Sequence, residues 1–122
     1  MEGWIKLHRK ILTSQIFKNE KLLKVWVWCL AKATHQEYEQ LVGKRLIHLE
    51  RGQFIYGRRK ASEELNMKES TVRDYMQLLK NLRNLDIKSD NKFSVVTIVN
   101  WDLYQIQERK SDIKSDSKTT TK

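Results

Sequence analysis

The sequence predicts a single, mainly α-helical domain that carries a small antiparallel β-hairpin in its second half. The chain has 122 residues, of which 39% are hydrophobic, enough for one compact domain with a buried core. Apolar residues recur at helical spacing in the segments 20–34 and 60–82. Residues 93–99 (FSVVTIV) are rich in β-branched side chains and follow a polar stretch, which predicts a strand after a turn.

The first third of the chain is expected to contain one dominant helix. Residues 4–12 read as a short amphipathic helix or an extended arm, and residues 14–19 as a turn. Residues 20–34 have an acidic start, no helix breaker and an apolar core, LLKVWVWCLAKA. Because this helix is apolar on nearly every side, it is either the central helix of the domain or also part of a subunit interface. Residues 35–41 are expected to continue or end it.

Two short β-prone runs occupy the middle of the chain. Residues 42–44 are expected to form a turn, and the runs 46–49 and 53–56 lie on either side of Glu50-Arg51-Gly52. This pattern predicts either a hairpin or a single strand with a bend. Gly57 ends the second run.

Residues 60–82 contain two helical patterns that are out of phase. We expect one helix over about 60–65 and a second over about 69–82, joined by a tight turn, which is the helix-turn-helix pattern. Asn66 can adopt the left-handed conformation that such a turn requires, and Met67 would fill the space between the helices. The second helix would pack on the core through Val72, Met76 and Leu79.

A β-hairpin is expected directly after these helices. Residues 86–88 and 93–99 are its strands and residues 89–92 its polar tip. Helix, helix and hairpin in this order predict a winged helix-turn-helix over residues 1–107. Residues 108–122 contain one apolar residue and are expected to be a disordered low-complexity tail or linker. The residues expected to fold back onto the core after the hairpin are Trp101, Leu103 and Tyr104.

The charge of the chain favours a polyanionic partner. The 24 basic residues outnumber the 15 acidic ones and give a net charge of +9. Nucleic acid is the first such partner and an anionic membrane surface the second, while a basic protein with neither partner is the plain alternative. No apolar run approaches the roughly 18 residues of a membrane span. The single Cys29 excludes an internal disulfide and fits a reducing compartment, so a cytoplasmic protein is expected.

The second helix of the motif is expected to meet base edges in the major groove of duplex DNA. Arg73 and Gln77 are the principal candidates, because arginine pairs well with guanine and glutamine with adenine. The full set of expected base contacts is Ser70, Thr71, Arg73, Asp74 and Gln77. The expected phosphate contacts are Arg58, Arg59, Lys60, Lys68, Lys80, Lys88 and Lys92.

The sequence contains no constellation typical of an enzyme, a cofactor site or a metal site. His8, His35 and His48 are too scattered for metal-ligand spacing, and His35 near two glutamates reads as a solvated helix end. The four glycines are isolated, so no glycine-rich loop is available to hold a phosphate. Neither catalysis nor a cofactor is expected.

Three features in combination resemble a known family: GQF followed by Gly57-Arg58, the helix-turn-helix, and VNWDLY after the hairpin. Over about residues 3–105 the chain resembles the N-terminal winged-helix domain of DnaD-like replisome organisers, the replication initiation proteins of phages and prophages of Gram-positive bacteria. The resemblance implies binding of origin DNA, a role in primosome assembly or helicase loading, a helicase loader or other replisome protein as partner, and homo-oligomers. Self-association would then use Val25, Trp28 and Cys29.

The sequence departs from this family at three positions. Asn66 stands where the turn usually has glycine, Lys68 where a serine usually caps the second helix, and Asn84 where glycine often precedes the hairpin. Full-length members also continue into a C-terminal domain, where this sequence has its low-complexity tail.

Two alternatives stay open. A transcriptional repressor of the same fold would need a stable dimer and a palindromic site. A protein-interaction module that binds a replisome protein or a host defence protein would fit the mixed charge of the second helix, where Glu69 and Asp74 stand beside Lys68 and Arg73.

Overall fold

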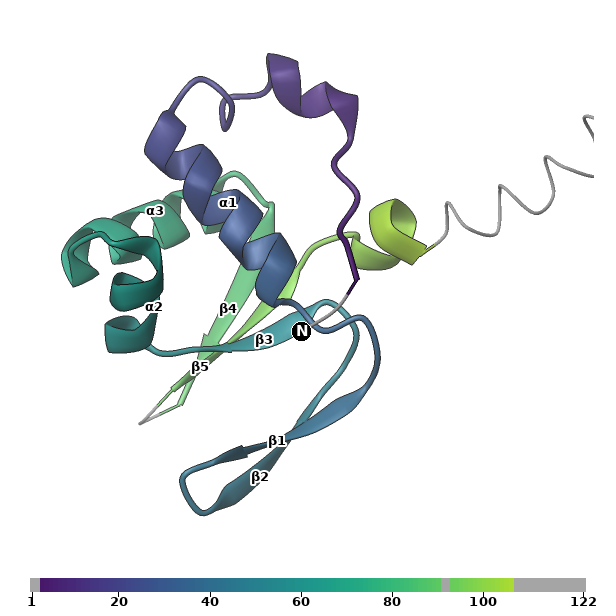
Figure 1. Ribbon diagram of the computed structural model, residues 1–122, viewed down its shortest axis with the longest axis vertical. Helices are drawn as coiled ribbons and strands as arrows, with labels where there is room; N and C mark the ends of the chain where they lie inside the picture. Colours follow the sequence, from purple (N-terminus) through teal and green to yellow (C-terminus); the bar gives the residue numbers. More distant parts are fainter. Residues whose placement is uncertain (1–2, 91–92, 107–122) are drawn as a thin grey trace, which may run out of the picture.

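The computed structural model describes residues 3–90 and 93–106 (Figure 1). Helices and small antiparallel sheets alternate along this part of the chain, which makes it a small α+β domain. In chain order the elements are a 3-10 helix η1 (Arg9–Thr13), α1 (Glu20–Lys32), β1 (Tyr38–Val42), β2 (Arg45–Leu49), β3 (Gln53–Tyr56), α2 (Arg58–Leu65), α3 (Glu69–Asn81), β4 (Leu85–Ser89), β5 (Ser94–Ile98) and a short π-helical turn η2 (Asp102–Ile106).

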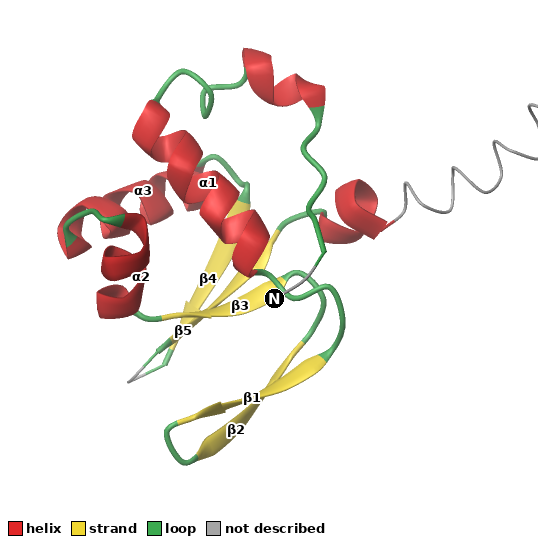
Figure 2. Ribbon diagram, in the orientation of Figure 1, coloured by secondary structure: helices red, strands yellow, loops and turns green. Residues whose placement is uncertain are grey.

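The strands form two separate antiparallel sheets, coloured yellow in Figure 2. β1 pairs only with β2, whereas the second sheet has the order β3-β5-β4. β5 therefore lies in the middle, with Phe54 of β3 opposite Val96 on one side and Ile87 of β4 opposite the same residue on the other. The expected hairpin after the two helices is confirmed, and its second strand also binds the strand that precedes them.

α1 begins at a signal that the sequence contains and ends where the chain turns to bind a distant segment. The side chain of Asn19 accepts hydrogen bonds from the backbone N–H groups of Lys21 and Leu22, both at 3.1 Å, which caps the helix. The helix ends at Lys32, two residues earlier than expected, because Thr34 leaves the helix to bind backbone groups of Gly52 and Gln53.

The expectation for residues 35–41 is wrong, because most of them belong to a strand. Tyr38–Val42 is β1, and it pairs with β2 across a turn in which Gly43 has φ +63°. The runs 46–49 and 53–56 do not pair with each other, so the expected hairpin between them is also wrong. β3 pairs with β5 instead, since Gly52 donates a hydrogen bond to Thr34 and accepts one from Ile98.

α1 is the central helix of the domain. It packs against α2, α3 and the larger sheet, and Val25 and Cys29 on it have no exposed surface. The Cys29 sulfur lies 3.6 Å from the Met76 sulfur of α3. Val25 and Cys29 are therefore buried by their own chain, and their expected role in self-association is wrong. Trp28 also faces this chain: its ring packs edge-on against Phe54 at 5.5 Å.

The N-terminal segment is joined to η2. Gln105 accepts a hydrogen bond from the backbone of Lys6 at 2.9 Å and donates one back to it at 2.8 Å. Trp101 is buried as expected, but Leu103 is 49% exposed, so it does not fold back onto the core. The side chain of Tyr104 and residues 108–122 lie outside the description. None of the described helices has the length and apolar character needed to cross a bilayer.

Candidate nucleic-acid interface

The turn between α2 and α3 sets the direction of α3. Asn66 has φ +56° and ψ +48°, the left-handed conformation expected for it. The backbone N–H of Met67 donates to the Ser62 carbonyl at 3.2 Å, while the Ser62 hydroxyl donates to the Met67 carbonyl. The ammonium group of Lys24 donates to the carbonyl of Leu65 at 2.8 Å. These bonds hold the turn to α2 and the end of α2 to α1, and Met67 packs against the core as expected.

α3 begins without a capping side chain. Lys68 stands at the N-cap, and within residues 3–90 its side chain makes no capping hydrogen bond. Glu69 in the first turn complements the positive end of the helix dipole. The first backbone N–H groups of α3 are therefore left for water or for an anion from outside the chain.

α3 has a buried face and an exposed face that lie opposite each other. Val72, Met76 and Leu79 are at most 1% exposed. Positions three and four apart share a helix face, so the opposite face forms a stripe. We define the α3 stripe as Ser70, Arg73, Asp74, Gln77 and Asn81, all of which are exposed.

The stripe contains four of the five residues expected to contact bases. Thr71 is the exception, because it lies at the edge of the stripe and is half-buried. Asn81 was missed, although it follows Gln77 at i+4 and accepts a hydrogen bond from its amide at 3.2 Å. Arg73 lies 3.7 Å from Asp74 in an exposed ion pair. The stripe can thus present guanidinium, carboxylate and amide groups in a row.

Tyr56, at the end of β3, is buried and feels charges from both α2 and α3. Burial raises the pKa of this phenol above its usual value, and the positive charges of Arg58 and Arg73 oppose that rise while Glu69 adds to it. Among the described residues no group hydrogen-bonds to the Tyr56 hydroxyl. The charges of Arg58 on α2 and of Arg73 on α3 thus both act on this phenol.

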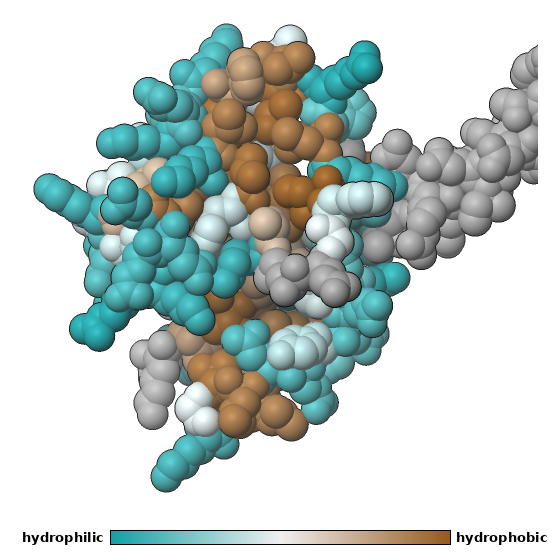
Figure 3. Space-filling view, viewed as in Figure 1, coloured by the Kyte–Doolittle hydropathy of each residue, from teal (hydrophilic) through white to brown (hydrophobic). Residues whose placement is uncertain are grey.

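The expected phosphate contacts are spread over this surface. Arg58, Arg59 and Lys60 form the exposed first turn of α2. Lys68 and Lys80 stand near opposite ends of α3, about 18 Å apart along its axis at 1.5 Å per residue. The remaining two are Lys88, which is exposed on β4, and Lys92, which lies outside the described residues. Figure 3 shows hydrophilic side chains gathered over α2 and α3, and apolar ones over the N-terminal segment and α1.

The left-handed residue at the end of α3 is one position before Asn84, where the resembled family often has glycine. Arg83, and not Asn84, takes the left-handed conformation, with φ +66°. Asn84 donates to the Leu79 carbonyl at 3.0 Å and Arg83 to the Lys80 carbonyl at 2.9 Å, which is the Schellman pattern of helix ends. Its left-handed position usually holds glycine.

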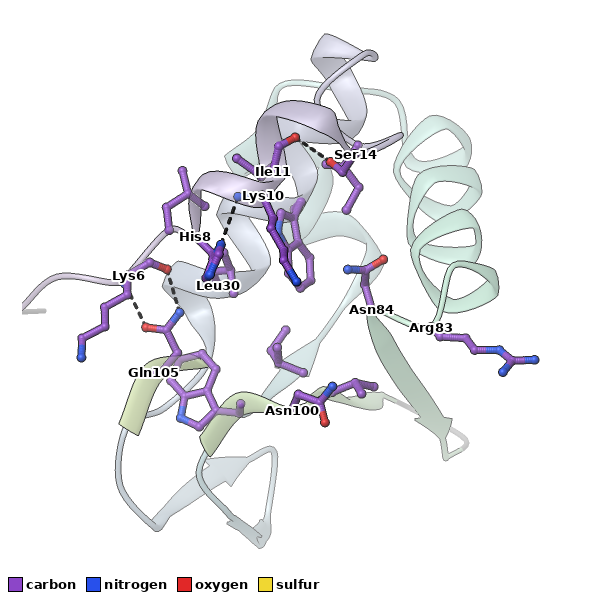
Figure 4. Close-up of a pocket in the computed structure, with 16 residues that line it drawn as sticks. Lys6, His8, Lys10, Ile11, Ser14, Leu30, Arg83, Asn84, Asn100 and Gln105 are labelled. Carbon is purple, nitrogen blue, oxygen red and sulfur yellow. Dashed lines mark hydrogen bonds between the residues drawn. The ribbon is translucent and has the colours of Figure 1, made fainter. Parts of the chain in front are cut away.

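A cavity of about 250 Å³ lies on another part of the molecule, beneath the N-terminal segment. Figure 4 shows η1 on one side of it and Asn84, Asn100 and Gln105 on the others, with the Arg83 side chain pointing away. Its apolar lining comes from the N-terminal segment, from α1, and from the end of β5 with the residues that follow it, and no acidic residue is among the described residues that line it. The residues of the α3 stripe are absent from its lining, so the cavity is separate from the candidate interface.

The histidines do not form a metal site. His35 packs edge-on against Trp101 at 5.0 Å and does not join the glutamates near it in sequence. His48 lies 3.6 Å from Glu37 and 4.0 Å from Glu39 instead. Residues 3–90 and 93–106 contain no group of three or more side chains placed to hold a metal ion.

Comparison with protein-family models, with curated proteins and with solved structures finds no match to the chain.

Proposed function

We propose that α2, α3 and the β3-β5-β4 sheet form a winged helix-turn-helix, and that the chain binds duplex DNA with it. The observation that carries this proposal is the α3 stripe. Its side chains project from the face opposite the buried Val72, Met76 and Leu79, and α2, which packs against α3, has an exposed basic first turn. The β4–β5 hairpin, which follows α3 directly, takes the place of the wing.

In this mechanism the stripe of α3 enters the major groove. Arg73 leaves its exposed pair with Asp74, which costs little because such pairs are weak in water, and donates two hydrogen bonds to a guanine. Gln77 exchanges its bond with Asn81 for an adenine, and Asp74 can accept from a cytosine amine. The backbone contacts come from the basic residues on α2, α3 and β4, which set the register of the helix on the duplex.

Fluorescence anisotropy with labelled duplex and single-stranded DNA across a salt series tests the proposal. With six described basic residues on phosphates, log K should fall with log salt at a slope of about −5. Arg73→Ala with Gln77→Ala should weaken binding to the preferred duplex at least about 10-fold, since each lost base contact is worth about 1–3 kcal/mol.

A matched control separates recognition from a general loss of charge. Arg9→Ala with Gln15→Ala removes the same two residue types from exposed positions of the N-terminal segment. We expect this control to bind like the unaltered chain. A folded chain that binds neither DNA at low salt refutes the proposal, and so does a control that weakens binding as much as the α3 variant.

The narrower part of the proposal is that this is the DNA-binding module of a phage-type replication initiation protein, with a helicase loader as partner. It is supported by the resemblance to DnaD-like proteins alone. Size-exclusion chromatography of the chain with a purified bacterial helicase loader tests it, because a complex would elute earlier than either protein. Self-association would have to use surfaces other than Val25 and Cys29, which are buried.

One observation favours a second candidate, a protein-interaction module. Asp74 is 75% exposed in the middle of the α3 stripe, where a carboxylate would repel phosphates. If α3 binds a protein, Arg73→Ala with Gln77→Ala would leave any DNA affinity unchanged and reduce binding to that protein instead.

A further inference from the structure

The β1–β2 hairpin projects from the domain and is fixed at its base. Leu49, at the end of β2, is only 2% exposed, whereas Leu41 and Leu46 near the tip are 67% and 62% exposed. The two strands contact each other far more than they contact any other described element. A two-stranded hairpin alone is only marginally stable in water, so its free end needs a further contact to keep one position.

That contact is made with the tip of the other hairpin. A guanidinium nitrogen of Arg45 lies 2.8 Å from a carboxylate oxygen of Asp90, at the end of β4. The same guanidinium group lies 5.5 Å from the centre of the Phe93 ring, just before β5, within the range of a cation–π interaction. We call these three residues the tip contact. It holds two hairpins together that are far apart in the sequence.

The tip contact also changes the charge at the end of the β4–β5 hairpin. Asp90 alone would place a carboxylate where a wing approaches the DNA backbone. Arg45 neutralises it at hydrogen-bonding distance, and its neighbour Lys44 remains as an exposed cation in the β1–β2 turn. Both partners of the pair are largely exposed, and such a pair contributes little to stability. The pair therefore matters mainly because it fixes the position of the β1–β2 tip against the β4–β5 tip.

We propose that the tip of the β1–β2 hairpin is a second contact with the phosphate backbone of duplex DNA, with Arg45 as the positioning residue and Lys44 as the contacting one. In Figure 1 this tip, the described ends of β4 and β5, and the turn between α2 and α3 all lie on the left of the view. Since the ion pair between Arg45 and Asp90 joins the two hairpin tips, a duplex on the wing would also meet Lys44, the residue next to Arg45. The inference rests on the proposed function and extends its footprint to an element outside the three-stranded sheet.

The charge-neutral pair Arg45→Ala with Asp90→Asn tests the positioning role. It removes one positive and one negative charge, so the net charge of the chain stays the same while the ion pair between Arg45 and Asp90 is lost. We expect duplex affinity to fall about 3- to 10-fold at fixed salt, while the melting temperature stays unchanged. If the pair had a purely structural role, the melting temperature would fall and the affinity of the folded chain would stay unchanged. The charge exchange Arg45→Asp with Asp90→Arg should restore part of the affinity.

Lys44→Ala tests the contact itself. We expect the slope of log K against log salt to become less negative by about 1, the loss of one phosphate contact. Lys18→Ala, an exposed lysine in the turn before α1, is the matched control and should leave the slope unchanged.

Three results would overturn the inference, and they differ in what else they imply. If the unaltered chain binds DNA but Lys44→Ala keeps the full slope, the hairpin contact is wrong and the proposed function stands. If the unaltered chain binds no DNA, both the hairpin contact and the proposed function are wrong. If Leu41→Ser with Leu46→Ser lowers the mass in solution while Lys44→Ala has no effect, the hairpin is an interface between copies of this chain.

Discussion

Gly52 gives the sharpest test of the packing, because a methyl group there would meet Trp101. Its φ of +83° lies in the region that other residues rarely adopt, and a Cβ placed on it would stand 2.6 Å from Cβ and 2.7 Å from Cγ of Trp101. The backbone cannot move away easily, since Gly52 donates to Thr34 and accepts from Ile98, both at 2.8 Å. Gly52→Ala should therefore combine backbone strain with overpacking.

The magnitude follows from these two terms. An L-residue with positive φ costs about 1–2 kcal/mol, and an extra methyl group in a packed site costs about 1–3 kcal/mol. We expect Gly52→Ala to lower the free energy of unfolding by about 3 kcal/mol. For a domain of about 100 residues this corresponds to a fall in melting temperature of about 12–24 °C. The measurement is urea unfolding followed by tryptophan fluorescence, supported by a thermal scan.

Two other glycines separate the cost of backbone strain from the cost of overpacking. Gly43 has φ +63° with nothing within 4 Å of an added Cβ, so Gly43→Ala should lose about 1 kcal/mol from strain alone. Gly57 has an ordinary φ of −121° and open space, so Gly57→Ala should stay within about 0.5 kcal/mol of the unaltered chain. Equal losses for Gly52→Ala and Gly43→Ala would refute the reasoning, because Trp101 could then not be packed against Gly52.

Three further predictions concern α1, α2 and the end of α3. Arg83→Gly should stabilise the domain by about 1 kcal/mol in urea unfolding, because glycine takes the left-handed position without strain. Burial raises the pKa of the Cys29 thiol, so it stays protonated, and its reaction with a disulfide reagent should be at least about 1,000-fold slower in the folded chain than in urea. The hydrogen bond from Trp28 holds the pKa of Glu64 below its usual value. The stability from this carboxylate is complete above its unfolded pKa of about 4.3 and is lost as pH falls through the folded pKa, so Glu64→Gln should flatten the fall of stability below about pH 4.3.

Each of these predictions has a result that contradicts it. An Arg83→Gly variant that is less stable would mean that the arginine side chain contributes more than its backbone costs. Rapid labelling of Cys29 in the folded chain would mean that α1 opens locally. Parallel pH curves for Glu64→Gln and the unaltered chain would mean that the bond from Trp28 is absent in solution.

Local rules predicted the α2–α3 region well. The turn at Asn66 follows from the left-handed tolerance of asparagine, and the buried face of α3 follows from the spacing of Val72, Met76 and Leu79. Both are decided within a few residues of the chain, so the sequence contains the necessary information. The exposed stripe opposite that face followed from the same spacing, except that Thr71 lies at its edge and Asn81 was missed.

Features decided by distant segments could not be predicted in the same way. The run Tyr38–Val42 suits a helix end as well as a strand, and only its pairing with β2 selects the strand. An all-round apolar helix must be covered, but the sequence does not reveal whether its own chain covers it, so Val25 and Cys29 were assigned to the wrong surface. The tip contact was missed because Arg45 and Asp90 are 45 positions apart.

The central place of β5 has a consequence for how the chain is made. Gln53 on β3 bonds through its side chain to Thr97, which lies 44 positions further along, and β4 likewise has β5 as its partner. While the ribosome synthesises α2 and α3, β3 has no neighbouring strand. Its apolar side chains stay uncovered until Val96 and Ile98 of β5 have been synthesised. A ribosome that stalls after β4 would hold two strands without the one that joins them, an incomplete sheet with open edges that can pair with a neighbouring nascent chain.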